Sequence, residues 1–375
     1  MDCLVNPVTN VSGEVLLIRA DASVAIGTGH VMRCLALAQA WQDAGGTCVY
    51  GMVDSTQAVV ERVQAEGFSV ARLDVAPGSA QDAAGFVQLA QARGAHWVVV
   101  DGYQFGSEYQ RKLKEAGLKI LFVDDHGHAE HYSADLVLNQ NPHATDGMYS
   151  SREMYTGLLL GPKYAMLRRE FAKWREWKRE IPAVARKVLV TMGGSDPDNI
   201  TLRVMKALAT AKIDRLQAVV VSGGSSPHIG SLQKAATQLA GKVDLVSNIS
   251  NMPERMAWAD VGIIAAGGTL WELLCMGCPV LSYARNSVQG RIIAQLQNEG
   301  VVRGLGDPRN YDEASLVSTI TDLATSPECR ARMSSLGKEL ADGIGPQRLC
   351  DLLAGENMLP VEGRRNMKQY PVEEL

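Results

Sequence analysis

The sequence predicts an α/β protein with two Rossmann-like domains, each built on a parallel sheet, that face a central cleft. Its 375 residues exceed one ordinary domain, and 46% apolar with 21% charged residues is typical of globular proteins. Short apolar runs alternate with segments of helical period along most of the chain. The alternation stops between residues 161 and 186 and then resumes, which indicates two domains.

Each short apolar run bounded by turn residues is expected to form a buried strand. The strands expected in the first half are Val15–Ile18, Thr47–Met52, Phe68–Leu73, Trp97–Asp101, Lys119–Asp124 and Asp135–Leu138. Those expected in the second half are Lys187–Met192, Gln217–Ser222, Val243–Val246, Asp260–Ala265 and Pro279–Tyr283. Helices fill the intervals. The first is Val31–Asp43, whose apolar residues recur with helical period.

The break between the two series is rich in basic residues, with acidic residues interleaved among them. That mixture favours a solvated linker helix over a nucleic-acid patch. The expected organisation is an N-terminal extension at 1–14, a first domain at 15–163, a linker helix at 164–186, a second domain at 187–352 and a frayed tail at 353–375.

Bulk composition narrows the class of function. With 37 basic and 41 acidic residues the net charge is −4, which gives no general attraction to nucleic acid or an anionic membrane. Seven scattered cysteines do not form a disulfide pattern, and the pair Cys275 and Cys278 ends an apolar helical run, where a buried structural role is expected. No spanning apolar stretch and no basic signal-peptide region occurs, so a cytoplasmic location is expected.

The loop after the first strand is the first candidate for chemistry. Gly27 and Gly29 let the backbone turn and approach a ligand, and His30 follows in the first turn of the next helix. The positive end of that helix favours a neutral imidazole that can accept a proton. Asp21 could orient the ring or hold a substrate hydroxyl. A plain strand–helix turn with a capping histidine is the alternative.

Two glycine-opened helices in the second half indicate phosphate binding at helix N-termini. In the first, Gly193 and Gly194 precede Ser195 and Asp196, either of which could instead simply cap the helix. The second begins with Gly267, Gly268 and Thr269, and its Glu272 could accept hydrogen bonds from ribose hydroxyls, or be only a surface glutamate. Past the next strand, Asn286 and Gln289 add amide donors or cap the helix that follows.

Polar residues also end two strands of the first domain, at Asp101–Tyr103 and Asp124–His126. Their side chains are expected to point into the same cleft as His30. The nearby His128 and His131 raise the question of a metal site, but their spacing matches no familiar ligand pattern, so no metal is expected.

Several stretches resemble the GT-B superfamily, to which the MurG-type transferases belong, and more closely the UDP-2,4-diacetamido-2,4,6-trideoxy-β-L-altropyranose hydrolases of pseudaminic acid biosynthesis and the related spore-coat polysaccharide proteins. The stretches are IRADASVAIGTGHVMRCLALAQAW, VVVDGYQF, VDDHGHAEHYSADLVLNQN, LLGPKYAMLRREF, VLVTMGGSDPDN and AAGGTLWELLCMGCPV. They cover about residues 15–290. The segment ARNSVQG departs from the family's AxNQ pattern, with Ser287 where glutamine is expected.

The resemblance implies a GT-B fold and a role for each candidate residue. The expected catalytic residues are His30, as general base, and Asp21. The expected substrate-binding residues are Arg19, Gly27, Gly29, Arg33, Tyr103, Asp125, His126, Asn286 and Gln289. The expected UDP-binding residues are Gly193, Gly194, Ser195, Asp196, Gly267, Gly268, Thr269 and Glu272. No metal or cofactor is expected.

The reaction that these roles imply is hydrolysis of a UDP-linked diacetamido sugar at its anomeric carbon with inversion, which releases UDP and a free sugar for nonulosonic acid or surface polysaccharide synthesis. Two alternatives stay open, a GT-B glycosyltransferase that uses a UDP-sugar donor and an inert UDP-sugar-binding protein. The expected partner is the UDP-sugar alone, without nucleic acid or membrane insertion, on a monomer or weak dimer.

Overall fold

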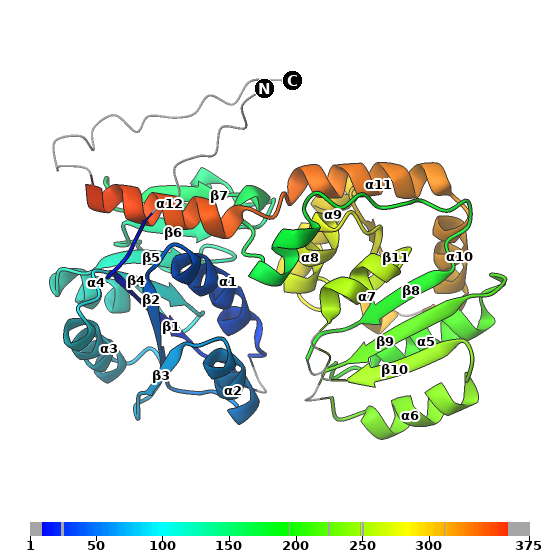
Figure 1. Cartoon of the computed structure of the whole chain (residues 1–375), viewed down its shortest axis with the longest axis horizontal. Helices are drawn as coiled ribbons and strands as arrows, with labels where there is room; N and C mark the ends of the chain where they lie inside the picture. The colour runs from blue at the N-terminus through cyan, green and yellow to red at the C-terminus, as the bar shows by residue number, and fades with distance from the viewer. Residues whose placement is uncertain are drawn as a thin grey trace.

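The computed structural model consists of two α/β lobes joined by a linker (Figure 1). It describes residues 10–358 except positions 24, 25, 195, 224, 225, 248, 250 and 311. Most of the expected N-terminal extension and residues 359–375 of the expected tail therefore lie outside the described residues. Within the described part of the chain, no helix is both long and apolar enough to cross a bilayer.

The first lobe is built on a seven-stranded parallel sheet with the strand order β3-β2-β1-β4-β5-β6-β7. Its strands are β1 Val15–Ala20, β2 Thr47–Met52, β3 Ser69–Arg72, β4 Trp97–Asp101, β5 Lys119–Val123, β6 Leu136–Asn139 and β7 Gly157–Leu160. The central strands are buried on both faces, because helices cover both sides of a parallel sheet.

The second lobe is built on a six-stranded parallel sheet with the equivalent order β10-β9-β8-β11-β12-β13. Its strands are β8 Lys187–Thr191, β9 Gln217–Ser222, β10 Val243–Ser247, β11 Val261–Ala265, β12 Val280–Tyr283 and β13 Arg303–Gly304. All eleven predicted strands are present within one or two residues at most ends. Sequence analysis missed β7, a four-residue run, and β13, which has only two residues.

Helices flank each sheet as the alternating pattern predicts. In the first lobe they are α1 Gly29–Asp43, α2 Gln57–Ala65, α3 Ala80–Arg93 and α4 Ser107–Glu115. After β8 they are α5 Ile200–Thr210, α6 Ile229–Gln238, α7 Met252–Trp258, α8 Gly268–Cys275, α9 Ser287–Asn298, α10 Glu313–Ala324, α11 Pro327–Leu340 and α12 Gly345–Met358. Cys275 and Cys278 are buried and unpaired, in agreement with the structural role expected for them.

The last helix differs from the prediction, because α12 returns to the first lobe and packs along α1 (Figure 1). Leu349, Leu353 and Ala354 belong to the core cluster that contains Leu35 and Trp41 of α1. The expected tail beginning at 353 therefore starts within a buried helix. The buried residues of α12 pack on α1 and on the 3-10 helix Pro162–Tyr164, so this helix completes the core of the first lobe.

The linker also differs from the prediction, since no α-helix spans 164–186. It contains the short 3-10 helices Pro162–Tyr164 and Arg169–Trp174, and the rest is irregular. Its charged side chains bind both lobes, with Arg169 paired to Asp43 and Lys173 paired to Glu254. Such tertiary contacts override the weak helix propensity of the segment.

Candidate active site

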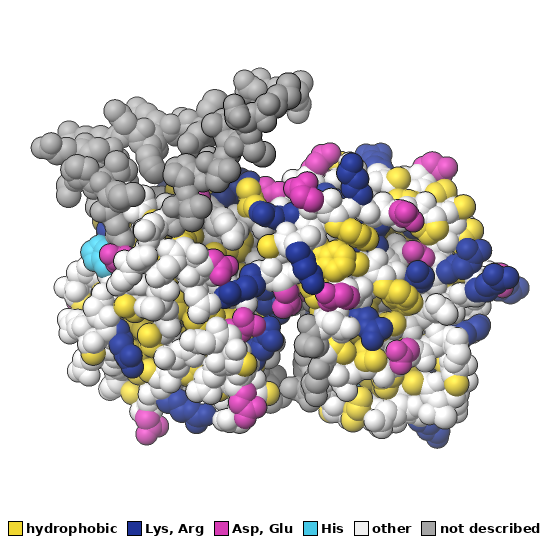
Figure 2. All heavy atoms as spheres, in the orientation of Figure 1, with side chains coloured by type: hydrophobic (Ala, Val, Ile, Leu, Met, Phe, Trp, Pro, Cys, Tyr) yellow, Lys and Arg dark blue, Asp and Glu magenta, His cyan; other side chains and the backbone are white. Residues whose placement is uncertain are grey.

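The strands β8, β9 and β10 of the second lobe end on the side that faces the first lobe (Figure 1). An open gap separates the two lobes below the linker (Figure 2). In each sheet the strand order reverses between the two central strands, β1 and β4 in the first and β8 and β11 in the second. Ligands of open α/β sheets bind at such reversal points. His143 of the loop after β6 in the first lobe lies close to Arg291 of α9 in the second lobe. The positive charge of Arg291, together with burial, lowers the pKa of His143.

His30 and Asp101 meet at the reversal point of the first sheet. The His30 Nδ1 atom lies 2.6 Å from Asp101 Oδ1, and the Asp101 side chain is fully buried. Burial alone opposes ionisation, but Arg33 and His30 hold the pKa of the Asp101 carboxyl well below its usual range. An ionised Asp101 accepts the proton on Nδ1, so in the neutral imidazole the lone pair is on Nε2.

A network of ion pairs fixes this arrangement. The Arg33 guanidinium donates two hydrogen bonds of 2.7 Å to Asp101 and one of 2.8 Å to Asp125. Asp125 also accepts from the Tyr103 hydroxyl at 2.9 Å and from Asn141 at 2.9 Å. Burial opposes its ionisation, but Arg33 lowers the pKa of Asp125. The Tyr103 ring stays half-exposed and packs edge-on against His30, with 5.0 Å between ring centroids.

His30 opens into a cavity of about 340 Å³ that is also lined by Asp21, Ile26, Asp101, Gly102, Tyr103 and Gln104. Gly27, at a φ of +78°, makes the left-handed turn that brings α1 to this cavity, and Gly29 begins the helix. These placements agree with the predicted cluster around His30.

The role expected for Asp21 in orienting the ring is wrong, because Asp101 binds His30 instead. Asp21 accepts hydrogen bonds from Arg19 at 2.7 Å and from the backbone N–H of Val53 at 2.8 Å. Arg19 is fully buried between Asp21 and Asp82, so its expected contact with substrate is not available in this structure. Both residues stabilise the turn beneath the site. The sequence did not reveal the partner of His30 because several carboxylates lie at or just after strand ends in this domain, Asp21, Asp101 and Asp124 among them.

In the second lobe, the predicted anion site at the start of α5 is occupied by the chain itself. Asp196 is buried, and its carboxylate accepts hydrogen bonds from the backbone N–H groups of Ile200 at 3.0 Å and Thr201 at 2.9 Å. The capping alternative is therefore correct for Asp196. Gly193 and Gly194 are exposed beside it, and Ser195 lies outside the described residues.

The start of α8 is the more open helix end. Gly267 and Gly268 are exposed, and no side chain caps the helix. One turn on, Glu272 accepts a hydrogen bond of 3.0 Å from Arg168 of the linker. Burial raises the pKa of Glu272, although Arg168 opposes that shift. The first turn of α8 therefore leaves backbone N–H groups open to a ligand, as an anion site at a helix N-terminus requires.

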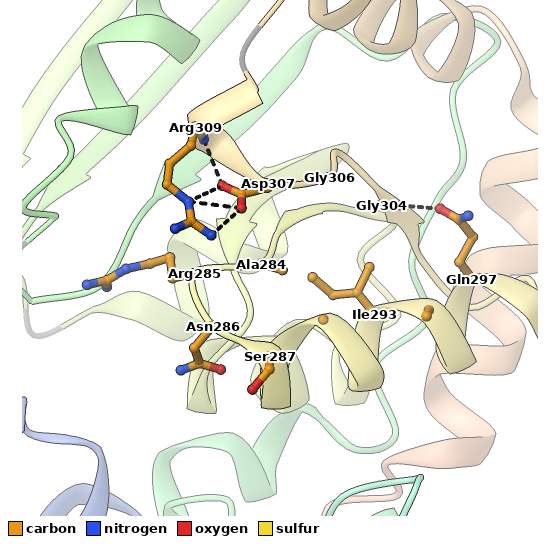
Figure 3. Close-up of a pocket in the computed structure, with 12 residues that line it drawn as sticks. Ala284, Arg285, Asn286, Ser287, Ile293, Gln297, Gly304, Gly306, Asp307 and Arg309 are labelled. Atoms are coloured by element: carbon orange, nitrogen blue, oxygen red, sulfur yellow. Dashed lines mark hydrogen bonds and ion pairs between the residues drawn. The ribbon is translucent and has the colours of Figure 1, made fainter.

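The N-terminus of α9 borders a second cavity, of about 540 Å³, shown in Figure 3. Asn286 caps α9 by accepting from the Gln289 backbone N–H at 2.9 Å, and the Gln289 side chain accepts from the Arg285 backbone N–H at 2.9 Å. The capping alternative is thus correct for both amide oxygens.

Arg285 is a residue that sequence analysis missed. Its guanidinium donates to the Met192 carbonyl at 3.4 Å and lies beside Gly193, at the end of β8. Figure 3 shows it pointing away from Arg309, which pairs with Asp307. Arg285 has no carboxylate partner among the described residues. The sequence feature that could have indicated Arg285 is its position directly before the predicted cap, Asn286.

The turn after β5 brings three possible metal ligands together, although their spacing in the sequence matches no familiar metal site. Ligand atoms of Asp124, His126 and His128 all lie within 4.8 Å of one another. His131 lies apart from them and bonds to Ser151 and Glu153.

Comparisons with solved structures identify the fold. The structure is similar to MurG of Acinetobacter baumannii, with a TM-score of 0.65 and 14% identity, covering 91% of this chain and 99% of that one. It is also similar to Anabaena HepE in complex with UDP-glucose, with a TM-score of 0.58 and 15% identity, covering 91% of this chain and 99% of that one. The protein has a GT-B fold, as the sequence predicted.

Comparisons with curated proteins confirm the predicted resemblance. The chain is 26% identical over 266 residues to the UDP-2,4-diacetamido-2,4,6-trideoxy-β-L-altropyranose hydrolase of Campylobacter jejuni, covering 70% of this chain and 88% of that protein. It is 27% identical over 256 residues to the spore coat polysaccharide biosynthesis protein SpsG of Bacillus subtilis, covering 66% of this chain and 73% of that protein.

An uncharacterised protein of Methanocaldococcus jannaschii is 26% identical over 280 residues, which are 73% of this chain. The match spans 56% of that longer protein. No family model matches the sequence.

Proposed function

We propose that this protein hydrolyses a UDP-linked sugar at the anomeric carbon with inversion of configuration. The observation that carries the proposal is the pairing of His30 Nδ1 with the ionised Asp101 at the edge of an open cavity. Nε2 of His30 takes a proton from water as that water attacks C1, and UDP leaves from the opposite face. A base in this position accelerates such a step by about 10²–10⁴-fold.

The departing UDP is bound by the second lobe in this scheme. The free N–H groups at the start of α8 and the Arg285 guanidinium supply positive potential for the diphosphate. Glu272 keeps one carboxylate oxygen toward Arg168 and offers the other to the ribose hydroxyls. Because Asp196 caps α5, we assign the diphosphate to the uncapped α8.

The sugar class proposed is a 2,4-diacetamido-trideoxy hexose, which rests on the name of the C. jejuni relative. Tyr103, half-exposed beside His30, offers an apolar ring face on the sugar side of the cavity. Such a face suits a 6-deoxy sugar, whose C6 methyl group is apolar. The free sugar would then serve nonulosonic acid or surface polysaccharide synthesis.

A glycosyltransferase is the second candidate, favoured by the transferases among the similar structures. There His30 would deprotonate an acceptor hydroxyl instead of water. Incubation with the UDP-sugar alone separates the candidates. Free sugar and UDP indicate a hydrolase, release only with an added acceptor indicates a transferase, and binding without turnover indicates an inert binding protein.

The test is anomeric-proton NMR on a panel of UDP-2,4-diacetamido sugars, with wild type and His30→Gln. We expect inverted free sugar from wild type, a turnover loss of about 10²–10⁴-fold in the variant, and unchanged UDP affinity. His96→Gln is the matched control, because His96 is exposed at the opposite end of β4. Near-normal turnover in His30→Gln contradicts the assignment.

A further inference from the structure

A compact turn follows β5 and folds two imidazole rings back onto one carboxylate. Asp124 Oδ1 accepts hydrogen bonds from the backbone N–H groups of His126 at 2.7 Å and Gly127 at 2.9 Å. Gly127 has a φ of +73°, which reverses the chain within one residue. As a result, His126 and His128 lie on the same side of the turn, with 5.5 Å between their ring centroids.

Ring nitrogens of His126 and His128 lie close to the Asp124 carboxylate. Nε2 of His128 donates to the Phe105 carbonyl at 3.0 Å, so in the neutral ring Nδ1 carries the lone pair. That Nδ1 lies 3.2 Å from Asp124 Oδ2. Nδ1 of His126 is buried and has no hydrogen-bond partner among the described residues. Buried polar atoms that stay unpaired are costly, and a cation held by these three residues would give the histidine nitrogens a partner.

The separation of two of these ligand atoms is also compatible with a shared metal ion. Two ligands at about 2.0–2.1 Å from a tetrahedral zinc ion are separated by about 3.3 Å, close to the 3.2 Å between His128 Nδ1 and Asp124 Oδ2. Outer-shell partners are also present, since the Tyr132 hydroxyl donates to Asp124 at 2.5 Å and Phe105 holds His128. Metal sites use such partners to orient their ligands.

We propose that Asp124, His126 and His128 bind a transition-metal dication of the Zn²⁺ class. Two imidazole nitrogens and one carboxylate oxygen favour zinc, cobalt or nickel over magnesium or calcium, which prefer oxygen ligands. The Tyr103 ring lies 5.1 Å from the His126 ring and 5.9 Å from the His128 ring, so the ion sits behind Tyr103 and not at His30 Nε2. Its role is to fix the turn that carries Asp125.

The competing interpretation is a simple ion pair between a protonated His128 and Asp124, with His126 left unpaired. It needs no metal and makes no use of His126. The two interpretations therefore differ in whether His126 contributes to metal affinity.

The experiment measures binding of Zn²⁺ and Co²⁺ to the full chain after chelator treatment, by calorimetry and cobalt absorption, without any UDP-sugar. We expect one equivalent to bind, a cobalt spectrum without thiolate bands, and a rise in Tm of about 2–4 °C at saturating metal. His126→Ala and His128→Ala should each weaken binding by more than about 100-fold, beyond the effect of losing an outer-shell partner.

His131→Ala is the matched control and should bind as wild type does, because His131 lies in the same segment outside the cluster. Absence of metal uptake by wild type, or uptake that neither His126→Ala nor His128→Ala weakens, overturns the proposal. Because no UDP-sugar is present, the result is independent of the hydrolase assignment.

Discussion

The two sheet edges that face each other are built in different ways. The edge of the first lobe consists of buried, ionised side chains locked in one arrangement, with Arg33 binding Asp101 and Asp125 at once. The edge of the second lobe consists mostly of exposed glycine backbone and helix ends, with Gly193, Gly194 and Gly267 open to solvent. A proton acceptor needs a fixed orientation, whereas a diphosphate needs accessible N–H donors and close backbone approach.

The difference also predicts where substitutions do most damage. In the first lobe, one carboxylate serves both the orientation of His30 and the neutralisation of Arg33, so its functions cannot be separated. In the second lobe, the proposed diphosphate site has several donors, so losing one donor leaves the others. Effects should therefore be large and concentrated in the first edge, and smaller and distributed in the second.

The largest effect is expected for Asp101→Asn. An amide would accept from Arg33 less well and could donate to His30 Nδ1, which moves the imidazole proton to Nε2 and removes the base. Turnover should fall by about 10²–10⁴-fold with little change in UDP affinity. The measurement is steady-state hydrolysis with UDP binding by calorimetry.

Asp21→Asn is the matched control, since Asp21 lines the same cavity and is equally buried but does not contact His30. We expect it to keep turnover within about threefold, because the backbone donors of Val53 and Asp54 can still reach its remaining oxygen. Equal losses in both variants would show that the edge acts as one structural unit and not through the His30–Asp101 pair.

An intermediate effect is expected for Arg285→Met in the second lobe. A hydrogen bond to a charged group contributes about 1.5–3 kcal/mol, so UDP affinity should fall by about 10–100-fold while uridine affinity stays unchanged. Arg309→Met is the control, because Arg309 lines the same cavity but is paired with Asp307. Calorimetry with UDP, UMP and uridine makes the test. A parallel loss of uridine binding would show that Arg285 does not act on phosphate.

Sequence patterns predicted the sheets well because the central strands are continuous buried runs, as in Lys119–Val123. These patterns placed His30 and Asp101 at the same edge of the first sheet, since both lie at the carboxyl ends of central strands. The patterns could not show whether Asp21 or Asp101 pairs with His30, because that depends on how α1 is rotated over the sheet. They also missed Arg285, whose position at Gly193 results from β12 lying next to β11.

The smallest effect is expected for Asp196→Asn, and it tests whether the α5 end is closed to ligand. Asp196 has a φ of 42°, which asparagine tolerates, so the substitution removes charge without adding backbone strain. Loss of a carboxylate at a helix N-terminus should lower stability by about 0.3–1 kcal/mol. UDP affinity should stay within about twofold, because the N–H groups of Ile200 and Thr201 face the cap and not the ligand. Thermal unfolding with and without UDP measures both quantities. A tenfold loss of UDP affinity at unchanged stability would show that the diphosphate binds at α5. The edge of the second lobe would then resemble that of the first, because both would use a buried carboxylate in the site.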